Sequence, residues 1–90
     1  MKKRARLEII RDILKVIQEN RNSIKYTPLL RKANISTSKF NEYHSELISK
    51  GFVIETKSQS GEKRISLTSK GFNFLEKYKT IINFIEEFEL

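Results

Sequence analysis

Short hydrogen-bonding side chains gather on one face of the segment from Ser36 to Lys50. Apolar residues recur there at Phe40, Tyr43, Leu47 and Ile48, and this helical spacing predicts an amphipathic helix. The opposite face holds Thr37, Ser38, Lys39, Asn41, Glu42 and Ser45. Ser, Thr and Asn both donate and accept hydrogen bonds, and they are short enough to let a helix enter the major groove of DNA. We therefore expect this face to contact base edges, with Ser36 as the helix cap. The alternative interpretation is a cluster of capping residues.

The residues nearest to enzyme chemistry do not form a catalytic pattern. His44 is the only histidine and the chain has no cysteine, so no disulfide and no His/Cys metal cluster is expected. Glu42 and Glu46 stand four residues apart on a mostly polar helix, where two solvated charges are favoured over an acid/base pair. No phosphate-binding loop of the G-x-x-x-x-G-K-[ST] type occurs. We expect no enzymatic activity, no cofactor, no metal and no small-molecule substrate. His44 is expected to be a half-buried helix residue, with a pH-sensing or phosphate-contacting role as the alternative.

The chain is basic over most of its length. The formal net charge is +7, and residues 1–70 hold 16 of the 18 Lys and Arg but only 7 of the 11 Asp and Glu. Such a balance favours nucleic acid or another acidic partner. Charged residues interrupt the basic and then apolar start of the chain, and no apolar run approaches the roughly 18 residues of a membrane span. We therefore expect no signal peptide, no membrane partner and a cytoplasmic, nucleoid-associated location.

The apolar spacing also predicts the elements that position these residues. Helices are expected over about residues 4–20, 27–34, 36–50 and 69–90. The first has an apolar stripe made of Leu7, Ile10, Ile13, Leu14 and Ile17. Thr27 is expected to cap the second helix, with Pro28 at its first position, and Asn34 is expected to end it. About three residues then separate the second and third helices, with Ile35 in the core, and this is helix-turn-helix spacing.

A change of period from 3.6 to 2 follows the third helix. Gly51 is expected to end that helix. Strand-like alternation then places Phe52, Ile54 and Thr56 on one face, and Ile65 and Leu67 do the same on a return arm. The polar stretch "KSQSGEKR" between them predicts a β-hairpin with an exposed loop, and Thr68 is expected to cap the last helix. The fold class expected is mainly α with a small β-hairpin (α+β).

Basic side chains lie close to the polar helix in this scheme. Lys57, Lys63 and Arg64 surround the hairpin loop, and Lys32 and Lys39 flank the turn before the helix. We expect Lys32 and Lys39 to contact phosphates, which sets affinity and salt dependence but not sequence choice. The three hairpin residues are expected to reach a neighbouring phosphate or the minor groove, with a solvated loop tip as the alternative. The amino-terminal "KKRAR" is either a basic arm on the DNA backbone or a frayed end.

The last helix has an apolar stripe longer than a domain of this size needs. Phe74, Tyr78, Ile81, Ile85 and Phe88 are separated by steps of 4, 3, 4 and 3, which is a coiled-coil seam. We expect Gly71, Phe72 and Leu75 to pack on the domain, and the outer part to bind a second copy of the chain. The predicted dimer interface is Phe74, Tyr78, Ile81, Ile82, Ile85 and Phe88. Folding back on the first helix is the alternative, and Phe84 lies off the seam.

Three stretches of the chain resemble small archaeal winged-helix proteins. They are "LEIIRDIL", the pattern "ANIS…F…Y…L…GFV", and "ISLTSKGFNFLEKY" with its Leu67, Thr68, Lys70 and Gly71. The match is to the 10a class of archaeal chromatin proteins and to ArnR-like winged helix-turn-helix domains. This resemblance implies a winged helix-turn-helix with a long C-terminal dimerisation helix in an antiparallel coiled coil, shortened here because the chain stops at Leu90. It also implies binding of double-stranded DNA, with residues 37–45 on the recognition helix and residues 57–64 in the wing.

Together these observations predict a homodimeric winged-helix protein that binds double-stranded DNA as a transcriptional regulator or nucleoid protein. Residues 1–68 would form the DNA-binding domain and residues 69–90 the dimerisation helix. A regulator with a preferred site is favoured over a purely architectural protein, because the helix presents hydrogen-bonding side chains. The alternative function is a winged-helix module that binds proteins and has no sequence-specific contact with DNA. An RNA-binding module is disfavoured, because the aromatic residues sit mostly at core spacing rather than on a stacking platform.

Overall fold

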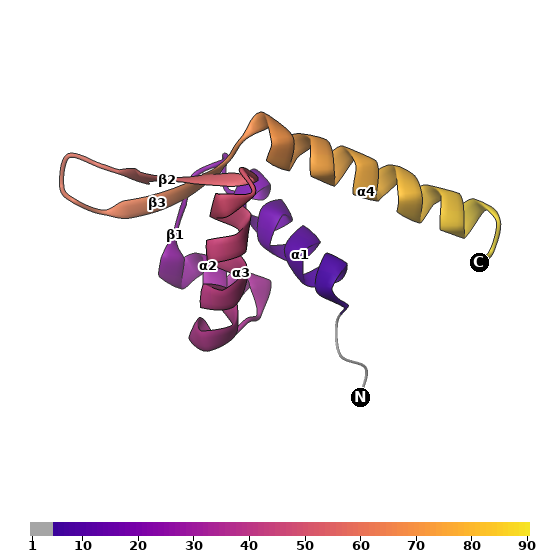
Figure 1. The fold of residues 1–90 in the computed structure, drawn as a ribbon, viewed down its shortest axis with the longest axis horizontal. Coiled ribbons are helices and arrows are strands. Elements are labelled where there is room, and N and C mark those ends of the chain that lie inside the picture. Colours follow the sequence, from indigo (N-terminus) through magenta and orange to yellow (C-terminus); the bar gives the residue numbers. More distant parts are fainter. Residues whose placement is uncertain (1–4) are drawn as a thin grey trace.

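The structure is a computed structural model that describes residues 5–90. Within this range the elements follow one another as α1 (Arg6–Glu19), β1 (Ile24–Lys25), α2 (Tyr26–Ala33), α3 (Thr37–Ser49), β2 (Val53–Lys57), β3 (Lys63–Leu67) and α4 (Ser69–Glu87). The hairpin of β2 and β3 extends from one end of the helical body, and α4 extends from the other (Figure 1). The described residues thus form a winged helix with a C-terminal helix, which confirms the predicted α+β class.

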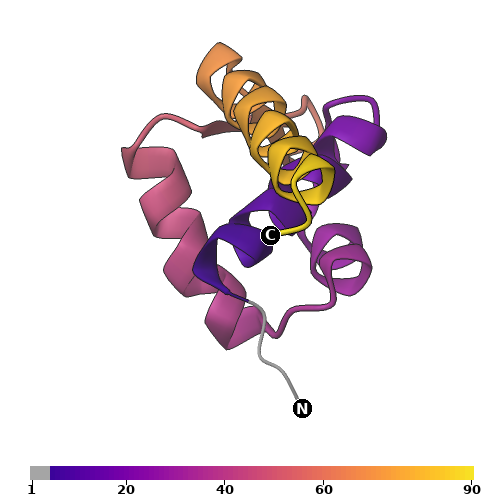
Figure 2. The same cartoon turned by 90° about the vertical axis from the view of Figure 1, so that its right-hand side faces the viewer.

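The core lies where the first three helices meet one face of the sheet. In Figure 2, α2 and α3 lie on either side of α1, and α4 runs above it. Ile13, Leu14 and Ile17 of α1 are almost completely buried. They pack with Leu29 of α2, Phe40 and Leu47 of α3, and Ile24, Val53, Ile65 and Leu67 of the strands. The predicted stripe of α1 is wrong at its first position, because Leu7 is 57% exposed while Ile9 is buried instead.

The sheet differs from the predicted hairpin in two ways. The short extended piece around Ile24 is strand β1, and it pairs with β3 to give an antiparallel sheet of order β1-β3-β2. The predicted phase of β2 is also wrong by one residue. Val53 pairs with Leu67 and is buried, whereas Ile54 pairs with Ser66 and is 49% exposed. The face that packs on the helices therefore contains Val53 and Glu55 rather than Ile54 and Thr56.

Local cap chemistry sets several of the helix ends. Ser36 caps α3 by accepting from the backbone N–H of Lys39 at 3.2 Å, and Thr68 caps α4 by accepting from the N–H of Gly71 at 3.2 Å. Gly51 follows α3 with φ +80°, as predicted for the residue that ends this helix. The predicted Thr27 cap is wrong. Helix α2 begins at Tyr26, with Lys25 in the cap position, and Pro28 still lies in the first turn, where backbone N–H groups have no helical partner.

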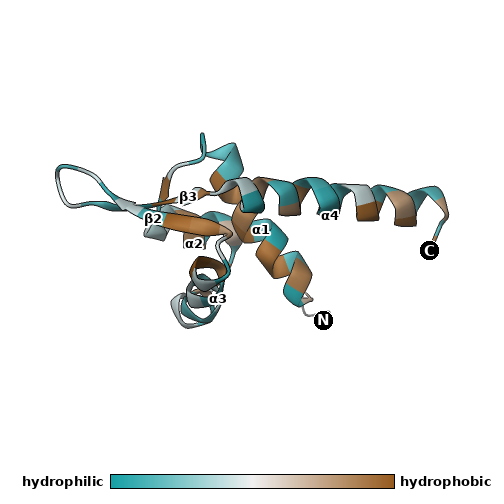
Figure 3. Ribbon diagram, turned by 45° about the horizontal axis from the view of Figure 1, so that its top comes forward, coloured by the Kyte–Doolittle hydropathy of each residue, from teal (hydrophilic) through white to brown (hydrophobic). Residues whose placement is uncertain are grey.

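Helix α4 is joined tightly to the base of the hairpin. Gly71 is buried, and a Cβ atom on it would lie 2.4 Å from the backbone oxygen of Phe52. Phe72 and Leu75 are partly buried against the core, as expected, and so is Phe74, which was predicted to lie in the dimer interface. Apolar segments continue along α4 to its C-terminal end (Figure 3), past the residues that reach the core. The first turns of α4 belong to the domain, and its outer turns project away from it.

Candidate nucleic-acid interface

The polar face predicted on the third helix is present and free on α3. Phe40, Tyr43 and Leu47 are buried, so the helix turns one side to the core. The six residues expected to contact DNA from this helix are all exposed: Thr37, Ser38, Lys39, Asn41, Glu42 and Ser45. One ion pair lies on this face, between Lys39 and Glu42 with 3.8 Å between the charged atoms. The helix therefore presents short hydrogen-bonding groups on a rigid, well-packed element.

A tight turn fixes the start of α3 against the end of α2. Asn34 adopts the left-handed conformation with φ 55°, as predicted. The N–H of Ile35 then donates to the oxygen of Leu30 at 3.1 Å, which is a standard helix-ending hydrogen bond. Ile35 is half-buried against the core, as expected for the residue between the helices. The turn therefore leaves little freedom in the angle between the two helices.

Arg31, which was not predicted, borders this turn on the side of α3. Arg31 lines an open hollow with Thr27 and Thr37, beside the start of α3. The ammonium of Lys32 instead donates to the side-chain oxygen of Asn20 at 3.2 Å, on the α1 side of the molecule. Leu29 and Ala33 are the buried residues of α2, so a helical wheel places Arg31 opposite the core and Lys32 nearer to it. The helical phase of the apolar residues in α2 could therefore have identified Arg31 from the sequence.

The wing, which is β2, the loop 58–62 and β3, presents two lysines on the helix-facing side of the sheet. Lys57 and Lys63 are directly paired across the hairpin and are exposed. They share a sheet face with Val53 and Ile65, which pack on the helices. The ammonium of Lys63 lies 3.8 Å from the carboxylate of Glu55. The wing therefore has its lysines on the side where α3 lies.

Arg64 does not extend freely from the wing. Its side chain is half-buried, and its Nε donates to the hydroxyl of Ser23 at 2.7 Å. It lies on the opposite sheet face from Lys57 and Lys63, because residues alternate along β3. The structure therefore separates Arg64 from the two lysines with which the sequence had grouped it.

A polar and aromatic cluster joins α2, α3 and the wing. The ring of His44 stacks on Phe40 with 5.2 Å between centroids and meets Tyr26 edge-on at 5.1 Å. The hydroxyl of Tyr26 lies 3.1 Å from Nε2 of His44 and donates to the carboxylate of Glu55. His44 is half-buried, as expected, and its Nε2 is 3.7 Å from Glu55. Tyr26 and Glu55 were not identified from the sequence, since they are 29 residues apart.

This cluster shifts the ionisation of each member in a way that keeps its hydrogen bonds. Burial, and then the hydrogen bond to Glu55, raise the pKa of Tyr26 far above its usual value of 10.0. That same hydrogen bond is the largest cause that lowers the pKa of Glu55, with Lys63 and His44 adding to it. Burial lowers the pKa of His44 below its ordinary 6.5, and Lys63 acts in the same direction, while Glu55 opposes them. Near neutral pH the group is therefore a phenol, a carboxylate and a neutral imidazole.

The carboxylates Glu42 and Glu46 take separate cationic partners. Glu46 pairs with Lys50 at 2.9 Å and with Arg6, whose guanidinium also lies over the ring of Tyr43 at 5.7 Å. This placement fits two surface charges better than an acid/base pair. Arg6 is the one basic residue of "KKRAR" that the structure describes, because Lys2, Lys3 and Arg4 lie outside the described residues.

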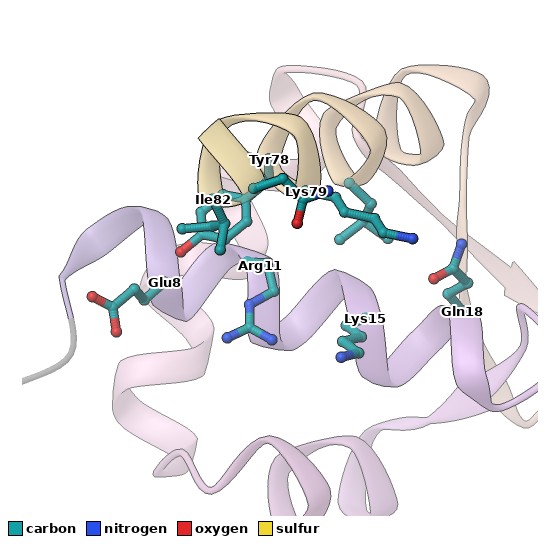
Figure 4. Close-up of a pocket in the computed structure, with 9 residues that line it drawn as sticks. Glu8, Arg11, Lys15, Gln18, Tyr78, Lys79 and Ile82 are labelled. Atoms are coloured by element: carbon teal, nitrogen blue, oxygen red, sulfur yellow. The ribbon is translucent and has the colours of Figure 1, made fainter. Parts of the chain in front are cut away.

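The residues predicted to form a dimer interface divide into two groups on α4. Phe74 meets the ring of Phe52 edge-on at 5.6 Å and stacks on Tyr78 at 6.1 Å, and Tyr78 also holds the guanidinium of Arg11 at 5.6 Å. Tyr78 and the half-buried Ile82 line a groove between α4 and α1 (Figure 4). The second group is exposed and contains Ile81, Ile85 and Phe88, together with Phe84.

Neither a cluster of metal-ligating side chains nor a membrane-spanning helix occurs within residues 5–90. No group of three or more His, Cys, Asp and Glu side chains is placed there to hold a metal ion. Over the same range, no helix combines the length and the apolar character that a membrane span requires.

Comparisons with known proteins agree with this geometry. A family model for the winged helix-turn-helix matches residues 3–86. No curated protein matches the chain in sequence. The fold is similar to that of Sso10a-2, a DNA-binding protein from Sulfolobus solfataricus, with a TM-score of 0.79 and 21% identity over 96% of this chain and 86% of that one.

Two further solved structures are similar to the chain. F-93 of SSV1 has a TM-score of 0.64 and 31% identity over 88% of this chain and 91% of that one. F93 from STIV, a winged-helix DNA-binding protein, has a TM-score of 0.75 and 23% identity over 89% of this chain and 91% of that one. The predicted resemblance to winged-helix proteins of this class is thereby confirmed. The chain belongs to the winged helix-turn-helix family.

Proposed function

We propose that this protein binds double-stranded DNA as a homodimer, with α3 in the major groove and the wing on the adjacent backbone. The observation that supports it most is the exposed face of α3, which has Thr37, Ser38, Asn41 and Ser45 beside few charges. A surface that serves only solubility would carry long charged side chains, whereas short donors and acceptors suit the edges of base pairs. Two of the similar solved structures are described as DNA-binding proteins, which favours the same function here.

Separate roles follow for the hydrogen-bonding and the cationic residues. Asn41 would make a bidentate contact with adenine, and Glu42 would accept from a cytosine amino group or repel phosphate at wrong sites. Lys39, Arg31, Lys57 and Lys63 neutralise phosphates. Lys32 and Arg64 are left out of this contact set, because Lys32 lies on the α1 side of the molecule and Arg64 lies on the sheet face opposite to Lys57 and Lys63. Sequence choice would then come from α3, and most of the affinity from the surrounding cations.

Homodimerisation is proposed through the outer turns of α4. Ile81, Phe84 and Phe88 are each more than half exposed, and Ile85 is 36% exposed. An amphipathic helix that projects from its domain with an apolar side must bury that side, and a second copy of the same helix is the simplest partner. We expect Ile81→Asp with Ile85→Asp to give a folded monomer with weaker DNA binding. The control is Asn73→Asp with Thr80→Asp, which adds the same charge at exposed positions of α4. A wild-type protein that sediments as a monomer would refute this assembly.

Fluorescence anisotropy with a labelled duplex over a salt series tests the DNA contact. Each phosphate contact should add about 0.9 to the slope of log affinity against log salt concentration. Lys57→Ala and Lys63→Ala should each lower that slope by about one for each protomer that loses a contact. The matched control is Lys79→Ala, which removes the same charge from an exposed position on α4 and should leave the slope unchanged.

Selection of bound duplexes from a random pool tests the preference for a site. Regulation of transcription requires enrichment of a sequence, and Asn41→Ala should relax one position of it, at a loss of about 1–3 kcal/mol of discrimination. Equal binding to scrambled duplexes at physiological salt would favour an architectural, nucleoid role instead. Absence of any duplex binding would favour a winged helix that docks on proteins.

A further inference from the structure

The wing is anchored in the core only at its base. Val53, Ile65 and Leu67 are buried, and every residue from Ile54 to Lys63 is exposed. Burial of these three side chains fixes only the base of the hairpin. The outer part, with Lys57 and Lys63, depends on polar contacts for its orientation relative to the helices. Figure 1 shows this outer part extending beyond the helices. A two-stranded ribbon of this kind is marginally stable when nothing packs against it.

Two of the polar contacts join the wing to residues in or next to β1. Arg64 donates to Ser23 at 2.7 Å, and Glu62 accepts from Lys25 at 3.0 Å. Since β1 and the wing belong to one sheet, these contacts strengthen the sheet itself. They do not determine its angle to α3.

Glu55 makes the contacts that lead to the helix-turn-helix. It is two residues beyond the buried Val53, on the helix-facing side of β2. Its carboxylate accepts from the hydroxyl of Tyr26 at the start of α2 and lies 3.7 Å from Nε2 of His44 in the middle of α3. Its other oxygen is 3.8 Å from the ammonium of Lys63. One side chain therefore touches α2, α3 and a wing lysine.

We propose that Tyr26, His44 and Glu55 are positioning residues that set the angle between the wing and the recognition helix, so that the two grip one DNA site together. The proposal rests on the proposed DNA binding, and none of the three residues needs to touch DNA. Tyr26 and His44 are themselves fixed, because both rings pack on Phe40 in the core. The cluster thus connects Phe40, a buried residue of α3, to the exposed wing.

Matched carboxylate variants separate this role from simple charge. Glu55→Ala and Glu62→Ala each remove one negative charge from the wing, so general electrostatics predicts slightly tighter duplex binding for both. If Glu55 positions the wing, Glu55→Ala should instead bind about three- to tenfold more weakly, as expected for losing one hydrogen bond that organises the site. Glu55→Gln should restore binding, because its amide oxygen still accepts from Tyr26. Equal tightening by both alanine variants would overturn the proposal.

A measurement without DNA decides the same question independently. Residual dipolar couplings of the backbone amides of α3 and of residues 53–67 should fit one alignment tensor in the wild-type protein, in Glu62→Ala and in Glu55→Gln. Glu55→Ala and Tyr26→Phe should require separate tensors for α3 and the wing. A single tensor in these two variants would refute the positioning role. Failure of the wild type to bind duplex DNA would refute the proposed function, and the couplings would still show whether the cluster sets the wing angle.

Discussion

Gly71→Ala is a substitution for which helix propensity and packing predict opposite signs. Gly71 lies in the first turn of α4. Alanine is favoured over glycine in a helix by about 0.5–1 kcal/mol, because alanine loses less backbone conformational entropy when the chain folds. A Cβ at this position would lie 2.4 Å from the backbone oxygen of Phe52 and 3.3 Å from Cδ2 of Leu67. The first of these separations is far inside van der Waals contact, so the backbone of α4 must move away from the sheet.

The carbonyl of Phe52 has little freedom to make room. It accepts hydrogen bonds from the N–H of Thr68 and from the hydroxyl of Thr68, both at 3.1 Å. A shift that relieves the clash weakens these bonds by about 1 kcal/mol in total, because the single proton of the Thr68 hydroxyl is also shared with the carbonyl of Gly51, and overpacking adds about 1–3 kcal/mol. These terms exceed the propensity gain, so we expect a net loss of about 1–3 kcal/mol in unfolding free energy.

Urea and thermal unfolding at a fixed protomer concentration measure this loss. For a chain of this size, 1 kcal/mol lowers Tm by about 4–8 °C, so Gly71→Ala should unfold about 5–20 °C earlier. The control is Asn73→Ala, at an exposed position two residues further along α4, which should change the unfolding free energy by less than about 0.5 kcal/mol. A variant as stable as the wild type, or more stable, would show that α4 does not sit against Phe52 as described.

Three other measurements test separate parts of the molecule. Ser36→Ala removes the cap of α3 and should lower stability by about 1 kcal/mol in urea unfolding, whereas Ser36→Asp should retain it; an unchanged midpoint for the alanine variant would exclude this cap. Leu14→Ala empties a fully buried position in α1 and should lose about 2–5 kcal/mol, so a loss below 1 kcal/mol would contradict the packing. Burial lowers the pKa of His44, so the folded protein binds this proton more weakly than the unfolded chain. Neutral His44 therefore makes its full contribution to folding stability above its ordinary pKa of 6.5. This contribution declines as the pH falls from there toward the lowered pKa of the folded protein. His44→Phe should lose less stability than the wild type as the pH falls below 6.5. Parallel pH profiles would refute this.

The parts of the fold that could be predicted from the sequence are those specified by neighbouring residues. Ser36 and Thr68 accept from N–H groups three residues ahead, and Asn34 and Gly51 supply the left-handed conformations that end α2 and α3. The polar face of α3 was predictable for the same reason, because a 3.6-residue period in one segment determines which side chains share a face.

The phase of β2 could not be predicted in this way. Val53 and Ile54 are adjacent, β-branched and equally suited to a buried strand position. The choice depends on distant contacts. The N–H of Phe52 donates to Leu47 at 2.9 Å, and its carbonyl accepts from Thr68 at 3.1 Å, which turns Val53 toward the core. A local alternation pattern contains no information on these partners.

Long-range side-chain contacts account for the differences at the candidate site. Lys32 and Arg31 are adjacent cations, and the position of α1 and Asn20 decides that Lys32 turns away from the start of α3. Arg64 turns away from the wing lysines because it donates a hydrogen bond to Ser23, which lies 41 residues earlier in the chain. The contact of Tyr26 with Glu55 likewise has no local signature. Apolar spacing on α4 predicted a coiled-coil seam. It could not show that Phe74 and Tyr78 would contact other residues of the same chain.

Binding of duplex DNA by α3 and the wing is tested most directly by titrating a selected duplex into ¹⁵N-labelled protein and following the backbone amide signals. We predict that the largest changes fall on residues 37–45 of α3 and on Lys57 and Lys63 with the loop between them, while the amides of the outer turns of α4 remain unchanged. Changes confined to α4 and α1, or no changes at duplex concentrations above the protein concentration, would contradict the proposed interface.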